Sequence, residues 1–128
     1  MKVSPVSIRL MLVASALLLA ACGGGGSTPA PAGPKGDAAQ GAQKFVGTCS
    51  ACHGPDAKGV AGLGKDLTIS EFVKGKSDDE LLAFVKTGRP ASDPANTAGV
   101  DMPPRGGNPA LTDQDLADII AHIRTLQK

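Results

Sequence analysis

The residues with the clearest chemistry are the two thiols and the imidazole of the segment Cys49-Ser50-Ala51-Cys52-His53. Two cysteines three positions apart, followed at once by a histidine, form the pattern through which a c-type haem is attached. The thiols can form thioethers with the two haem vinyl groups, and the imidazole is then directed at the iron. We therefore predict that Cys49 and Cys52 hold one haem c covalently, and that His53 is an axial ligand of its iron.

Two other uses of these side chains stay open. A Cys-x-x-Cys pair also serves thiol–disulfide exchange, but that use is expected within a βαβ pattern, and no segment here has the period-two pattern of a strand. A structural zinc site needs four Cys or His ligands. The side chains available for one, apart from Cys22, are Cys49, Cys52, His53 and His122. The haem is favoured over both.

The second axial ligand of such a haem has two candidates, Met102 and His122. Met102 is followed by Pro103 and Pro104, which restrict the backbone and stiffen a loop that would hold the thioether. A lone methionine is more often core filler, but filler is expected on a helix face. His122 falls on a predicted helix, where it would pack against another helix or provide bis-histidine ligation, which would lower the potential. We predict that Met102 is the second axial ligand. Methionine ligation would raise the reduction potential.

Helical segments must position these residues. Three of the predicted helices have clear N-terminal capping residues. Asp37 can cap a helix over 37–48 that leads into Cys49, and Gly41 inside it predicts close packing by another element. Ser77 and Glu80 form a capping box ahead of an apolar run that ends at Gly88. Thr112 caps a last helix whose apolar face is formed by Leu116, Ile119, Ile120 and Ile123. The predicted fold class is all-α.

The intervening segments carry weaker signals. Residues 68–73 could form a short helix, and 54–64 is a glycine-rich loop. Residues 89–108 show no helix or strand pattern, and so long a loop in a small domain indicates a functional role. Pro55 is a candidate to back the His53 imidazole or to accept its N–H through a carbonyl.

The N-terminus has the pattern of an export signal. Lys2 and Arg9 precede the apolar run 10–21, which is too short to span a membrane as a helix. The run ends Leu-Ala-Ala-Cys22, which resembles the bacterial lipobox, and an ordinary cleavage site with a chance cysteine is the alternative. We predict a lipoprotein signal peptide over 1–21, a lipidated Cys22 and flexible Gly/Pro/Ala linker over 22–36, and one folded domain over 37–128.

Composition limits what that domain can be. The chain of 128 residues has three Phe and neither Trp nor Tyr, so its core lacks large rings and a haem would fill the middle. Without Lys2 and Arg9, 11 basic side chains face 12 acidic ones. This balance gives no indication of a nucleic-acid partner, which would need clustered basic residues.

From Asp37 to Lys128 the sequence resembles a small class I cytochrome c. Gly41 and Phe45 match the N-terminal helix contact of that family, the segment 101–104 resembles its sixth-ligand loop, and 111–126 resembles its C-terminal helix. The resemblance implies three to five helices around one covalently bound haem, with the first and last helices crossing at Gly41.

The function expected from these features is one-electron transfer by a membrane-tethered cytochrome, not an enzyme, in a respiratory or other extracytoplasmic redox chain. The expected partners are donor and acceptor proteins and the membrane that receives the lipid, with no small-molecule substrate. The expected location is the periplasmic side of a bacterial membrane. A peroxidase or ligand sensor with an open haem site, and a fixed haem subunit of a larger complex, are the alternatives.

Overall fold

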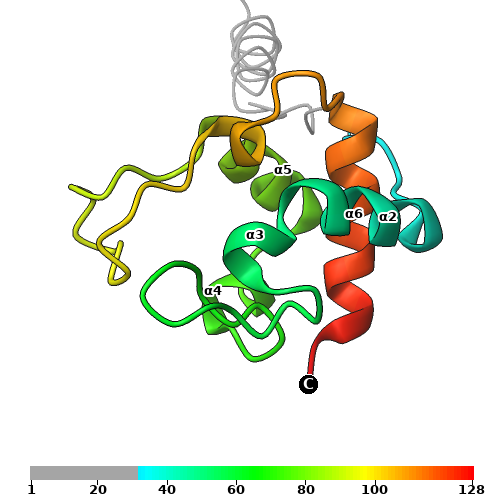
Figure 1. Cartoon of the computed structure of the whole chain (residues 1–128). Helices are drawn as coiled ribbons and strands as arrows, with labels where there is room; N and C mark the ends of the chain where they lie inside the picture. The colour runs from blue at the N-terminus through cyan, green and yellow to red at the C-terminus, as the bar shows by residue number, and fades with distance from the viewer. Residues whose placement is uncertain (1–31) are drawn as a thin grey trace, which may run out of the picture. The chain divides into compact units, whose positions relative to one another are not determined.

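The computed structural model describes residues 32–128, and this part of the chain contains α-helices, one 3-10 helix and no strand. The predicted all-α class is therefore confirmed. The elements are α2 (Ala38–Thr48), α3 (Ser50–His53), α4 (Glu71–Lys74), α5 (Asp78–Thr87), η1 (Pro104–Gly107) and α6 (Asp113–Leu126). Figure 1 shows α6 crossing α2, with α3, α4 and α5 to one side of this pair.

The main helix contact joins α2 to α6, which are the first and last helices of the described part (Figure 1). Gly41 is buried on α2, and a Cβ built there would lie 1.9 Å from the backbone oxygen of Asp118 on α6. Only glycine permits so close an approach, so the predicted packing role of Gly41 is confirmed. One turn further on, Phe45 is fully buried, and its ring centroid lies 5.6 Å from that of His122.

A buried carboxylate reinforces the same crossing. The Asp118 side chain is 5 % exposed, and Lys44 of α2 reaches it at 2.5 Å. The N–H of Asp37 and the amide of Gln114 also donate to Asp118, at 2.8 and 2.9 Å. Burial alone would raise the pKa of Asp118, but the hydrogen bonds from these groups outweigh it and lower the pKa below its ordinary value.

The N-terminal caps predicted for the three helices are all observed. Asp37 accepts the N–H groups of Ala39 and Gln40 at the start of α2. Ser77 with Glu80, and Thr112 with Asp115, form complete capping boxes on α5 and α6, and Gly88 ends α5. The short helix predicted over 68–73 is observed as α4, which begins after the cap Ser70.

The long loop after α5 has more structure than its sequence pattern indicates. Arg89 and Met102 form an isolated antiparallel bridge, and η1 follows immediately after Pro103. The Asn96 side chain closes the intervening turn, because its amide donates to the carbonyls of Pro90 and Val100. Internal hydrogen bonds therefore shape this loop.

The first described residues contact the domain. The N–H of Gly33 donates to Asp79 at 2.8 Å, and Gln114 donates to the carbonyl of Lys35 at 2.8 Å. These contacts fall within the segment predicted as linker, so at least its end from 32 to 36 follows the domain surface. The predicted signal peptide and the lipidation site Cys22 lie outside the described residues. Among the described helices, none has the length and apolar character needed to cross a membrane.

Candidate functional site

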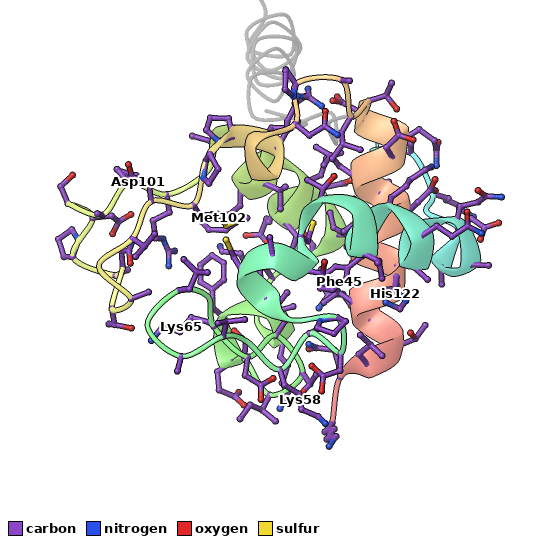
Figure 2. The ribbon with its side chains drawn as sticks, viewed as in Figure 1. Phe45, Lys58, Lys65, Asp101, Met102 and His122 are labelled. Atoms are coloured by element: carbon purple, nitrogen blue, oxygen red, sulfur yellow. The ribbon has the colours of Figure 1, made fainter. Side chains whose placement is uncertain are left out.

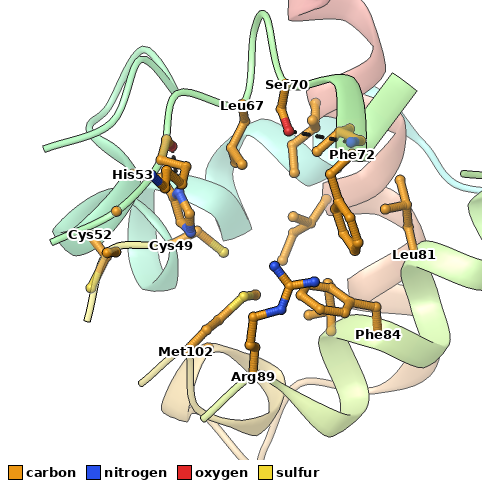
Figure 3. Close-up of a pocket in the computed structure, with 18 of the residues that line it drawn as sticks. Cys49, Cys52, His53, Leu67, Ser70, Phe72, Leu81, Phe84, Arg89 and Met102 are labelled. Carbon is orange, nitrogen blue, oxygen red and sulfur yellow. Dashed lines mark hydrogen bonds between the residues drawn. The ribbon is translucent and has the colours of Figure 1, made fainter. Parts of the chain in front are cut away.

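The described domain contains a cavity of about 510 Å³. Its wall is mostly apolar and includes side chains from α2, α4, α5 and α6, and the cysteines, His53 and Met102 stand on it (Figure 3). The apolar part of the wall includes Phe45, Leu67, Phe72, Leu81, Phe84, Leu116, Ile120 and Ile123. A space of this kind suits a large, flat, apolar cofactor.

The two cysteines reach the cavity from the junction of α2 and α3. The N–H of Cys49 continues α2 by donating to the carbonyl of Phe45 at 2.8 Å, and the N–H of His53 donates to the carbonyl of Cys49 at 2.9 Å. This helical geometry brings three chemically active side chains to one wall. Both thiols are free and half-buried.

The protonation of Cys49 argues against thiol–disulfide exchange. Burial, with a contribution from the neighbouring Cys52, raises the pKa of the Cys49 thiol to about 11. A thiol that exchanges disulfides has a lowered pKa, because the thiolate is the nucleophile. The zinc alternative also finds no support, because the described residues contain no cluster of three or more His, Cys, Asp or Glu side chains placed to hold a metal ion.

The His53 ring is oriented by a backbone group. Its Nδ1 lies 2.9 Å from the carbonyl oxygen of Lys65, in the loop that passes beside α3. With Nδ1 as the donor in this bond, Nε2 is the nitrogen left to bind a metal. The expectation that Pro55 receives the N–H is therefore wrong. A Cβ on Gly64 would lie 2.2 Å from the Cys52 carbonyl, so the glycine is what lets the Lys65 backbone come this close.

Met102 enters the same cavity from the long loop (Figure 3). Its N–H donates to the carbonyl of Arg89 and its carbonyl accepts the N–H of Arg89, both at 2.8 Å. The paired backbone and the prolines that follow fix the position of the thioether. Met102 and His53 thus belong to one cavity although the sequence separates them widely.

His122, the other candidate, lies elsewhere. It is absent from the cavity wall and packs at the crossing of α2 and α6, where its ring is tilted by 58° against that of Phe45 (Figure 2). The geometry favours the packing interpretation of His122 over bis-histidine ligation.

Sequence reasoning did not find the role of Arg89. Its side chain extends into the cavity and its guanidinium lies over the rings of both Phe72 and Phe84 (Figure 3). No local pattern marks it, because the contact depends on the fold of the loop back onto α5. A second arginine, Arg105, holds the loop from the other side by donating to the carbonyl of Leu111 and to Asp113, at 2.7 and 2.8 Å.

A haem fits this donor set. Two free thiols can form thioethers, an imidazole nitrogen and a thioether sulfur are suitable axial ligands for iron, and the wall around them is apolar. The fold and the cavity together define a small helical protein built around one covalently held cofactor.

Comparison with known proteins gives the same result. Residues 38–127 match the family model described as Cytochrome c. Cytochrome c-554(548) of Halomonas halodenitrificans is 38% identical over 87 residues, which cover 68% of this chain and 93% of that protein. No solved structure gives a significant match. The chain belongs to the cytochrome c family, whose proteins bind covalently attached haem c and transfer electrons.

A second relative is a subunit of a cytochrome c oxidase. The Cbb3-type cytochrome c oxidase subunit FixPc of Rhizobium leguminosarum bv. viciae is 43% identical over 61 residues, which cover 47% of this chain and 21% of that protein. The likeness therefore concerns part of one domain in a longer polypeptide.

Proposed function

We propose that this protein is a lipid-tethered one-electron carrier of an extracytoplasmic redox chain, with Cys49 and Cys52 as thioether attachments and His53 and Met102 as axial ligands. The observation that carries the proposal is the presence of all four side chains on one apolar cavity. When bound, the haem iron supplies reversible one-electron chemistry between its ferric and ferrous states.

The protein's own residues would keep the geometry constant between the two states. The Lys65 carbonyl fixes the imidazole of His53, and the backbone pair with Arg89 fixes Met102. The apolar wall excludes water, which would otherwise reorient when the iron charge changes. A site held in this way favours electron transfer, and a methionine ligand leaves no open position for a substrate.

The tether is the second part of the proposal. Lipidation at Cys22 after removal of residues 1–21 would hold the domain at the periplasmic side of a bacterial membrane, within reach of donor and acceptor proteins. Cys22→Ser is expected to move the protein from the membrane fraction to the soluble fraction without loss of haem. Retention of this variant in the membrane would contradict the lipid anchor.

The FixPc relative favours a second candidate, a fixed haem subunit of a membrane oxidase or reductase. Extraction in mild detergent separates the two. A carrier is released as a free monomer, whereas a subunit is recovered with its complex.

The visible and near-infrared spectrum of the oxidised holoprotein tests the ligand set. Haem that stays on the chain after denaturation confirms the thioethers. We expect a weak near-infrared sulfur-to-iron band that is lost in Met102→Ala and kept in the matched variant His122→Ala. Loss of the band in His122→Ala alone, or its absence from the wild type, would overturn Met102 ligation and point to a bis-histidine or open, enzymatic site.

A further inference from the structure

The residues that follow α6 are fastened to the loop that carries the Lys65 carbonyl. The amide Nε2 of Gln127 donates to the carbonyl of Leu67 at 2.5 Å, and the N–H of Lys128 donates to the carbonyl of Thr68 at 3.0 Å. Both acceptors follow Lys65 within three positions of the sequence. The end of the last helix is therefore connected to this loop by two hydrogen bonds.

Three consecutive peptide groups of the loop have one such partner each. The carbonyl of Lys65 lies 2.9 Å from Nδ1 of His53, the N–H of Leu67 donates to the carbonyl of the fully buried Ala57 at 2.7 Å, and the carbonyl of Leu67 accepts from Gln127. Figure 3 shows the Leu67 side chain pointing into the cavity that His53 also lines. Because each peptide group is planar, a turn of the third group changes the dihedral angles that orient the other two.

The Gln127 amide is oriented for donation. Its Oε1 is buried and has no hydrogen-bond partner among the described residues. A flipped amide would set Oε1 against the carbonyl oxygen of Leu67, and two acceptors cannot bond. A buried acceptor without a donor is costly, and an apolar side chain would avoid that cost. The donor that reaches the Leu67 carbonyl is therefore what the glutamine contributes at this position.

We propose that Gln127 is a positioning residue, which holds the Lys65 carbonyl at the His53 imidazole and so sets the strength of that hydrogen bond. This inference rests on the proposed function, in which His53 is an iron ligand through Nε2. Donation from Nδ1 makes an imidazole a more basic ligand, and a more basic ligand favours ferric over ferrous iron. Gln127 thus lowers the reduction potential through the loop, without touching the iron.

The same helix offers a matched control. The amide Nε2 of Gln114, in the first turn of α6, donates to the backbone carbonyl of Lys35 at 2.8 Å and to Asp118 at 2.9 Å. Gln114 is therefore also a glutamine that fastens a backbone segment to α6, but its acceptors lie outside the cavity wall. If Gln127 only stabilised the fold, its loss and the loss of Gln114 would have the same kind of effect.

The test follows the His53 Nδ1–H proton itself. Its exchange with solvent is measured by NMR in the reduced holoproteins, and redox titration gives the potential. Gln127→Met removes both polar atoms at similar volume and adds no charge. Gln127→Glu keeps the shape but replaces the donor by an acceptor. It is used for proton exchange alone, because its charge acts on the potential directly. Gln114→Met is the control.

We expect the proton to exchange about fivefold faster in both Gln127 variants, the factor for loss of one ordinary hydrogen bond. Gln127→Met should also have a higher potential, whereas Gln114→Met should match the wild type in both measurements. Gln127 variants that match Gln114→Met would overturn the proposal, and so would a higher potential with unchanged exchange, because the effect would then bypass His53.

If Gln127→Met takes up no haem, the exchange rate in Gln127→Glu decides by the same criterion. If neither variant takes up haem, Gln127 serves folding and the proposal fails. A wild type without covalent haem would instead overturn the proposed function itself.

Discussion

Replacement of Gly41 by alanine tests whether the close crossing of α2 and α6 holds the domain together. The new Cβ would lie 1.9 Å from the Asp118 oxygen and 2.9 Å from the Ile119 nitrogen, both backbone atoms. No side chain can rotate to relieve this clash, so the helices must separate by about 1.5 Å to restore ordinary contact. The separation would loosen Phe45 and the hydrogen bonds to Asp118.

The change in the free energy of unfolding caused by Gly41→Ala is the sum of one favourable and two unfavourable effects. Alanine favours an α-helix over glycine by about 1 kcal/mol. Overpacking costs about 1–3 kcal/mol, and weakened hydrogen bonds to a buried carboxylate cost about 1–2 kcal/mol more. We expect Gly41→Ala to lower the free energy of unfolding by about 1–4 kcal/mol on balance.

The same helix offers a matched control. A Cβ on Gly47 of α2 would meet nothing within 4 Å, so Gly47→Ala should raise stability by about 0.5–1 kcal/mol. The assay is urea unfolding of both holoproteins, followed by far-ultraviolet circular dichroism. Equal stability of Gly41→Ala and Gly47→Ala would refute the close crossing.

Two further predictions concern the buried carboxylate and the end of α5. Because folding lowers the pKa of Asp118, the ionised carboxylate stabilises the fold above its unfolded pKa, near 3.9, and this stabilisation is lost as the pH falls through the folded pKa. Asp118→Asn should therefore have a free energy of unfolding about 1–3 kcal/mol lower than the wild type at pH 7. In urea unfolding measured between pH 5 and pH 2, the variant should lose less stability than the wild type. Gly88 has φ +74°, and a Cβ there would lie 2.3 Å from the Met102 oxygen, so Gly88→Ala should weaken the sulfur-to-iron band while covalent haem is retained; an unchanged band would contradict this contact.

The helices could be predicted from the sequence because their signals are local. The caps Asp37, Ser77 and Thr112 and the apolar spacing of α6 lie within one or two turns of the helix ends they define. Gly41 was predictable as a contact because glycine is unfavourable inside a helix without a packing reason. The motif itself contains Cys49, Cys52 and His53, and the prolines after Met102 mark the loop.

The rest of the site depends on tertiary structure. The acceptor beside His53 belongs to Lys65 and not to the nearer Pro55, because a glycine twelve residues after Cys52 brings that backbone against α3. The place of Arg89 depends on the return of the loop to Met102, a pairing that no periodicity encodes. Backbone carbonyls and long-range pairs leave no residue-type signature, so sequence patterns cannot find them.

The long loop that carries Met102 joins the two sides of the cavity by hydrogen bonds, and this connection would limit rearrangement during electron transfer. On one side of Met102 the loop pairs with Arg89; on the other, Arg105 fastens it to Leu111 and Asp113 at the start of α6. Asn108 then donates to Thr48, the last residue of α2 before Cys49. The cavity wall that carries the cysteines and the wall that carries Met102 are therefore parts of one hydrogen-bonded frame. A frame closed in this way resists movement of His53 and Met102, the two proposed axial ligands, so a change in iron charge would be absorbed with little rearrangement, as the proposed one-electron carrier requires.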